Sequence, residues 1–165
     1  MPVMYNAEEI YQIGVEIEKN GESFYRAAVE STDSPDAKDL FEGLADWERG
    51  HIALFEELKA GLPPDVKTDD MPDPDEEKAR YLKAAADSHV FVQNKDINEL
   101  VADCEDAVAI LKLAMGFEKD SVVVYTSMKD MVPKNYGRDT IDRLIAEEIQ
   151  HVAMLQQKIE ALSGE

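Results

Sequence analysis

Residues 48–53 read ERGHIA, and residues 148–153 read EIQHVA. The two segments have a glutamate, a histidine and an alanine at the same places, and the offset between them is 148 − 48 = 100. A second pair of segments has the same offset, because EKNGESFY at residues 18–25 is matched by EKDSVVVY at residues 118–125. Two matches in one register, with no gap between them, indicate a duplicated helical hairpin.

The histidine of each copy follows its glutamate by three residues. Residues three apart on an α-helix lie on one face. Glu48 and His51 can therefore point at one spot, and so can Glu148 and His151.

The repeat also predicts how each hairpin bends. The midpoint between Glu18 and Glu48 is residue 33, and the midpoint between Glu118 and Glu148 is Pro133. An antiparallel pair of helices bent at these points places its two glutamates at the same level. Packing the two hairpins around a pseudo-twofold axis then brings four carboxylates and two imidazoles into the bundle centre.

Such a cluster requires a cation. Four uncompensated buried carboxylates are so costly that most would bind protons instead. Two divalent iron ions supply four positive charges, and carboxylate oxygens with one imidazole per metal suit iron or manganese better than metals that prefer thiolates. We therefore expect two iron ions, with manganese or zinc as alternatives. The expected ligands are Glu18, Glu48, His51, Glu118, Glu148 and His151.

Helical periodicity extends outward from these motifs. It predicts one hairpin over residues 6–60, with Asn6 and Glu9 as reciprocal caps, and a second over residues 103–162. The prolines and aspartates of residues 61–73 predict a loop. A start signal at residues 73–76 predicts a helix to about residue 89, followed by a bend near residues 93–94 and a helical turn after Asp96.

The expected fold is therefore all-α. It is a single domain over residues 1–165, an antiparallel four-helix bundle with an extra helix in the crossover at residues 61–102.

The composition excludes several classes of protein. The formal charge of −19 repels phosphate, so a nucleic-acid partner is not expected. No apolar run approaches the ~20 residues that span a bilayer, and the first residues lack a signal-peptide pattern, so we expect a cytoplasmic protein without a membrane partner. The single cysteine, Cys104, excludes an internal disulfide and the four thiolates of a rubredoxin-type site.

The Glu-x6-Tyr and Glu-x2-His motifs of both halves, taken together, resemble those of ferritin-superfamily proteins of the rubrerythrin type. The resemblance covers residues 6–60 and 103–162. It implies a ferritin-like bundle and a non-haem di-iron centre, and it implies that Tyr25 and Tyr125 hydrogen-bond to ligand carboxylates. The implied ligand roles are terminal for Glu18 and Glu118, bridging for Glu48 and Glu148, and one imidazole per metal for His51 and His151.

The chain also departs from the rubrerythrin pattern. Rubrerythrins usually carry a rubredoxin domain, whereas this chain stops at Glu165, so we expect an external electron donor such as rubredoxin. A further glutamate of rubrerythrins should fall near Ser121. Serine cannot replace it as an anionic ligand, which counts against efficient peroxide reduction. The remaining symmetric set is similar to a bacterioferritin ferroxidase centre, although Arg49 stands where bacterioferritins place a haem-binding methionine.

Three functions fit these motifs. The leading hypothesis is an oxidoreductase that reduces hydrogen peroxide or dioxygen and acts as a homodimer. The alternative is a ferroxidase that oxidises and then sequesters or transfers ferrous iron. The third is a structural or zinc-occupied site without redox chemistry.

Four aromatic side chains can be explained by packing as well as by a role at the metal site. Tyr25 and Tyr125 fit core packing as well as a hydrogen bond to a ligand. Trp47 is expected to pack between helices rather than to relay electrons, because its counterpart in the repeat is Glu147. His89 has no partner in the repeat and is expected at the surface or in packing.

Overall fold

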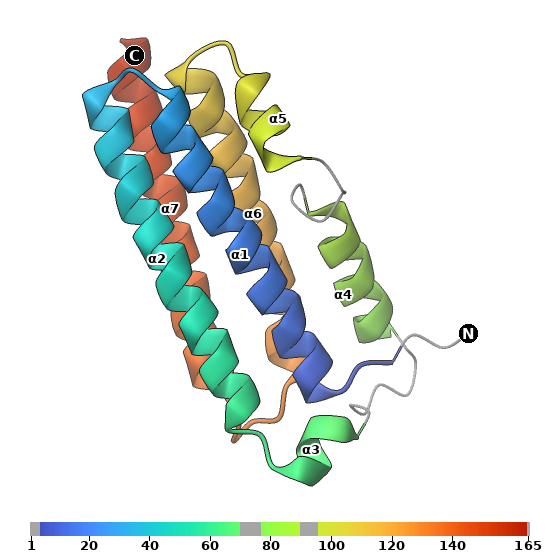
Figure 1. Cartoon of the computed structure of the whole chain (residues 1–165). Coiled ribbons are helices and arrows are strands. Elements are labelled where there is room, and N and C mark those ends of the chain that lie inside the picture. Colours follow the sequence, from blue (N-terminus) through green and yellow to red (C-terminus); the bar gives the residue numbers. More distant parts are fainter. Residues whose placement is uncertain (1–3, 70–76, 90–95, 165) are drawn as a thin grey trace.

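The computed structural model describes residues 4–69, 77–89 and 96–164, and the four long helices of this part of the chain lie side by side as a bundle (Figure 1). The bundle consists of α1 (Ala7–Ser31), α2 (Pro35–Ala60), α6 (Ala107–Met131) and α7 (Arg138–Ser163). The described residues of the crossover form three shorter helices: α3 (Pro64–Thr68), α4 (Glu77–Ser88) and α5 (Ile97–Ala102). The expected all-α fold with two long hairpins is confirmed.

The first hairpin begins and turns where its capping residues predict. The Asn6 side chain accepts a hydrogen bond from the Glu9 backbone at 2.9 Å, and the Glu9 carboxylate accepts one from the Asn6 backbone at 3.0 Å. Ser34 caps α2, and Pro35 occupies the first helical position, where its missing N–H is not needed. The hairpin therefore turns at residues 32–34, close to the predicted residue 33.

The second hairpin turns through Gly137, which precedes α7. Its φ of 119° lies in the left-handed region that favours glycine. A Cβ here would stand 2.6 Å from the hydroxyl oxygen of Tyr11, which itself donates a hydrogen bond to the Tyr136 carbonyl. This turn is therefore packed directly against the beginning of α1.

The crossover differs from the prediction in two places. Residues 64–68, expected in a loop, form α3, because Pro64 at the first helical position starts a helix rather than preventing one. The third long helix, expected from Asp103, begins at Ala107. Asp103 ends α5, and the Asp106 side chain caps α6 by accepting from the Ala109 backbone at 2.8 Å. The start signal at residues 73–76 and the bend at 93–94 lie outside the described residues.

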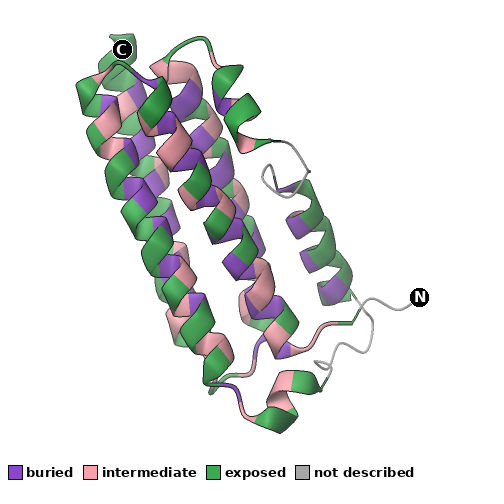
Figure 2. Ribbon diagram, viewed as in Figure 1, coloured by how far each residue is buried: buried purple, intermediate pink, exposed green. Residues whose placement is uncertain are grey.

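The buried residues of the four long helices face one another along the bundle axis (Figure 2). Helix α4 packs against α6, and α5 packs against α1. The backbones of α2 and α7 come within contact range at few places, whereas each pairs closely with its hairpin partner. In the described part of the chain, none of the helices combines the length and apolar character needed to cross a membrane.

Candidate metal centre

The structure brings all six expected ligands together in the middle of the bundle, at most 3% exposed. Each hairpin supplies one glutamate from its first helix and a glutamate–histidine pair from its second. The residues form two groups in which one nitrogen or oxygen atom from each side chain lies within 4.8 Å of the others. Glu48 and Glu148 belong to both groups, so they occupy the space between two adjacent positions. The two groups are Glu18, Glu48, His51 and Glu148, and Glu48, Glu118, Glu148 and His151.

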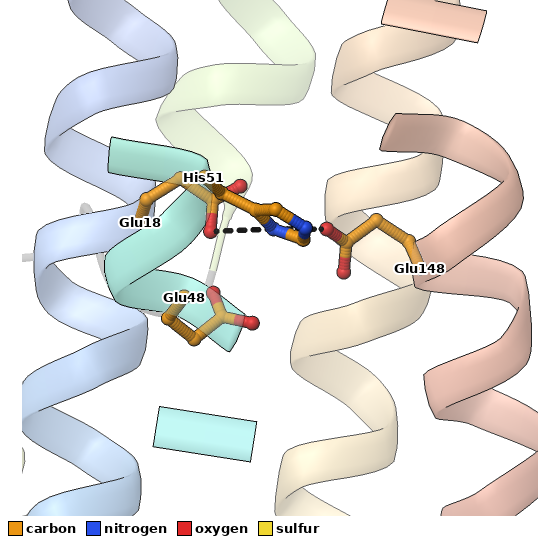
Figure 3. A group of neighbouring side chains, drawn as sticks. All are labelled: Glu18, Glu48, His51 and Glu148. Atoms are coloured by element: carbon orange, nitrogen blue, oxygen red, sulfur yellow. Dashed lines mark ion pairs between the residues drawn. The ribbon is translucent and has the colours of Figure 1, made fainter. Parts of the chain in front are cut away.

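His51 links the two hairpins within the first group. Figure 3 shows its ring between Glu18 of α1 and Glu148 of α7, with Glu48 to one side. Its Nδ1 lies 3.0 Å from Oε1 of Glu148 and 3.4 Å from Oε2 of Glu18. This nitrogen therefore faces the carboxylates from both halves of the chain.

His151 has the corresponding place in the second group. Its Nδ1 lies 3.3 Å from Oε2 of Glu148, 3.4 Å from Oε2 of Glu118 and 3.9 Å from Oε1 of Glu48. The rings of His51 and His151 are stacked at a centroid distance of 5.9 Å. The two imidazoles thus present the same nitrogen to one shared set of carboxylates.

Two buried tyrosines hold the outer glutamates. The Tyr25 hydroxyl donates to Oε1 of Glu118, and the Tyr125 hydroxyl donates to Oε1 of Glu18. Each bond therefore crosses from one hairpin to the other. Burial raises the pKa of both tyrosines well above its usual value, and the nearby carboxylates raise it further, so both hydroxyls remain protonated donors.

The centre leaves buried polar atoms without a hydrogen-bond partner. Buried polar groups are normally paired, so a cluster of unpaired oxygen and nitrogen atoms is what a cation-binding site requires. Oxygen atoms with one imidazole nitrogen per group form a donor set that suits iron or manganese. The residues present therefore fit a pair of divalent ions. Among described residues the unpaired atoms are Oε2 of Glu18, both carboxylate oxygens of Glu48, Nδ1 of His51, Oε2 of Glu118, Oε1 of Glu148 and Nε2 of His151.

The charges of the metal-free centre are balanced unevenly. Burial, reinforced by neighbouring carboxylates, raises the pKa of Glu48 and Glu118 well above its usual range. Burial would also raise the pKa of Glu148, but its close polar contacts with Glu118 and both histidines outweigh burial and lower that pKa. Burial would lower the pKa of the imidazoles, yet the carboxylates raise it to about 11 for His51 and about 9 for His151. Protons therefore occupy the imidazoles at neutral pH when no metal is bound.

Comparison with known proteins agrees with this geometry. The sequence profile described as Rubrerythrin matches residues 9–159, which is most of the chain. The chain belongs to the rubrerythrin family. A solved structure from Thermotoga maritima, described as a ferritin-like diiron-carboxylate protein, superposes with a TM-score of 0.73 over 95% of this chain and 96% of that chain. The two sequences are 22% identical, so this likeness concerns the fold, and it confirms the expected ferritin-like bundle.

A second similar protein matches only part of the chain. It is the encapsulin nanocompartment cargo protein EncC of Myxococcus xanthus, which is 39% identical over 90 residues. The match spans 54% of this chain and 60% of that protein, so it covers only part of the relative.

His89 is closer to the centre than its sequence position indicates. Expected at the surface or in packing, it is fully buried, with its Nε2 3.1 Å from the hydroxyl of Ser121. Burial lowers its pKa to about 4, so it is neutral at physiological pH. Ser121 is the residue near which the resemblance to rubrerythrins predicts a further glutamate. A neutral histidine and a serine are therefore paired at this position. The small side chain of Ser121 on a buried helical face is the feature of the sequence that indicates room for another side chain, such as that of His89.

The outer nitrogens of the two site histidines have unlike neighbours. Nε2 of His51 lies 2.8 Å from Oε2 of Glu147, whose side chain is 40% exposed. At the equivalent place beside His151 lies Trp47, 43% exposed, with its ring 4.8 Å from the imidazole and at 70° to it. Trp47 thus packs as expected, but it packs on a site histidine. Both residues lie where α2 and α7 face each other.

Proposed function

We propose that the six clustered residues hold two iron ions and that the chain is a non-haem di-iron oxidoreductase that reduces hydrogen peroxide or dioxygen. The observation that supports this most is the sharing of Glu48 and Glu148 between two overlapping groups of ligands. Two separate metal sites would have no residue in common. A shared pair of carboxylates is what two adjacent ions need in order to react as a unit.

The side chains would have paired roles. Glu48 and Glu148, which belong to both groups, would be shared by the two ions, while Glu18 and Glu118 would each bind one ion and each histidine would supply one nitrogen. Tyr25 and Tyr125 orient the terminal carboxylates through their hydrogen bonds. Two ferrous ions supply the two electrons that, with two protons, convert hydrogen peroxide to water. The buried apolar shell around the site restricts the access of water, and an external electron donor restores the ferrous state.

Rapid mixing of the anaerobic di-ferrous protein with peroxide, and separately with dioxygen, tests the reaction. We expect two irons per chain and oxidation much faster than for free ferrous ion. His51→Ala should abolish this acceleration, while the surface variant Glu42→Gln should retain it. Oxidation at the rate of free ferrous ion would overturn the proposal. Zinc as the sole metal after growth with iron, without redox change, would favour a structural site instead.

A ferroxidase is the second candidate, and two observations favour it. Ser121, which is paired with His89, stands near the position where the resemblance to rubrerythrins predicts a further carboxylate, and the partial relative from Myxococcus xanthus is an encapsulin cargo protein. In this case ferrous iron is the substrate, and the chain would be cargo of such a compartment. A dimer that retains two irons per chain during loading would favour the oxidoreductase. Uptake of many irons per chain, or co-sedimentation with a co-expressed encapsulin shell, would favour the ferroxidase.

A further inference from the structure

The two halves of the centre have the same glutamates and histidine in equivalent places, but the side chain that contacts the histidine from the opposite hairpin differs. Position 47 corresponds to position 147 in the repeat, since 147 − 47 = 100. A glutamate stands at one of these positions and a tryptophan at the other. Glu147 reaches His51, and Trp47 reaches His151, so each contact joins the two hairpins. The difference therefore falls on the side chain that each site histidine meets on the opposite hairpin.

Glu147 determines which nitrogen of His51 carries the proton in the metal-bound state. A carboxylate accepts hydrogen bonds, so Nε2 of His51 must donate at 2.8 Å. The lone pair is then on Nδ1, which faces Glu18 and Glu148. A carboxylate acceptor on the far side of a ligand histidine holds the ring in place and strengthens its donor nitrogen.

His151 lacks this support. Its Nδ1 faces the carboxylates in the same way, but its buried Nε2 has no hydrogen-bond partner in the described part of the chain. The edge-on ring of Trp47 restricts the space around the imidazole without accepting a proton in a directed bond. The ring orientation and the tautomer of His151 are consequently less constrained than those of His51.

We propose that Glu147 is a positioning residue that makes the two metal positions unequal, so that the ion beside Glu18 and His51 is held more tightly than the ion beside Glu118 and His151. This inference rests on the proposed metal site. Loss of such an outer hydrogen bond costs about 10- to 100-fold in metal affinity. The same factor separates the two positions in the unmodified protein.

Anaerobic calorimetric titration with ferrous ion measures the two steps directly. We expect two dissociation constants that differ by about 10- to 100-fold. Glu147→Ala should weaken the tighter step by about that factor and bring the two constants together. Glu147→Gln retains an oxygen acceptor without the charge, so its tighter dissociation constant should lie between those of the unmodified protein and Glu147→Ala. Equal constants in the unmodified protein, or equal weakening of both steps by Glu147→Ala, would overturn the inference.

The tryptophan position provides the reciprocal test. Trp47→Glu introduces a carboxylate opposite His151 and should tighten the weaker step, whereas Trp47→Phe should leave it weak. Mössbauer spectra of the di-ferrous protein should contain two unequal doublets that converge in Trp47→Glu. A Trp47→Glu protein that folds by circular dichroism but keeps the original difference would contradict the inference. Absence of any ferrous binding would refute the proposed metal site as well, whereas two equal sites would refute the inequality alone.

Discussion

Gly21 of α1 approaches Glu48 of α2 so closely that a Cβ at position 21 would stand 2.7 Å from Oε2 of that carboxylate and 2.6 Å from Cζ of Phe117. Gly21→Ala must therefore shift Phe117 and Glu48, and Glu48 belongs to the candidate metal centre. We expect a loss of about 1–3 kcal/mol in the free energy of unfolding, despite the better helix propensity of alanine. We also expect weaker iron binding. Denaturant unfolding and metal titration measure the two effects.

Gly116→Ala in α6 is the matched control, because a Cβ there would meet no atom within 4 Å. This variant should stabilise the chain by up to about 1 kcal/mol and leave iron binding unchanged. If Gly21→Ala behaved in the same way, the close approach to Glu48 would be wrong.

Removal of either site tyrosine hydroxyl leaves a buried carboxylate oxygen unpaired. Tyr25→Phe and Tyr125→Phe should each cost about 1–3 kcal/mol in the free energy of unfolding and should change the absorption of the iron-loaded protein. Tyr11→Phe is the control, since the Tyr11 hydroxyl bonds the Tyr136 carbonyl at the end of the bundle. It should lower stability while leaving the iron spectrum unchanged. A spectral change in Tyr11→Phe alone would contradict this assignment.

Iron binding should release protons. The pKa values of about 11 for His51 and about 9 for His151 place a proton on each imidazole of the metal-free protein at pH 7. A ligand imidazole must be neutral, so at least these two protons leave and the apparent affinity rises with pH. Their stabilising effect on the metal-free chain is present below pH 6.5 and is lost as pH rises through about 9 and 11. Titration in weak buffer with an indicator dye measures the release, and no acidification would count against these charges.

His89 should make the protein sensitive to acid. Its pKa is lowered by burial from 6.5 to about 4, so the folded state favours the neutral ring. This contribution to stability is complete above pH 6.5 and is lost as pH falls towards 4, by at most about 3 kcal/mol. His89→Gln should lose less stability than the unmodified protein over the same range. Parallel stability curves for the two proteins would contradict the lowered pKa.

Glu48→Gln should affect the metal-free and iron-loaded proteins in opposite directions. Burial raises the pKa of Glu48, so its charge destabilises the folded metal-free chain at neutral pH. The neutral amide should therefore raise the free energy of unfolding by about 0.5–2 kcal/mol without metal, and it should reduce the further gain on adding ferrous iron. Urea unfolding with and without iron tests both, with the exposed Glu42→Gln as control. Equal destabilisation in both states would refute this account.

The fold and the grouping of the six side chains could be predicted because one repeat contains them. A common offset sets which residues lie at the same level, and three-residue spacing sets which share a helical face. Both properties are local and survive tertiary packing. The start of α6 was misplaced because Asp103 and Asp106 are equally good capping residues, and only the end of α5 decides between them.

The neighbours of the centre could not be predicted in the same way. His89 is buried because α4 packs on α6, and this contact belongs to the crossover, which has no counterpart in the repeat. The contacts of Glu147 and Trp47 depend on how α2 and α7 face each other across the two hairpins. Such contacts depend on how side chains far apart in the sequence pack together, and helical periodicity does not predict this packing.

The crossed tyrosine bonds bear on the ancestry of the site. Tyr25 donates its hydrogen bond to Glu118, and Tyr125 donates to Glu18. The glutamate of each first helix is therefore hydrogen-bonded by the tyrosine of the other hairpin. In a dimer of one unduplicated hairpin, both bonds would run between subunits and the two iron positions would be identical by symmetry. Two copies fused in one chain are not bound by that symmetry, so positions 47 and 147 can carry different residues. A symmetric dimer would have one kind of metal position, whereas a chain with two fused copies can have two.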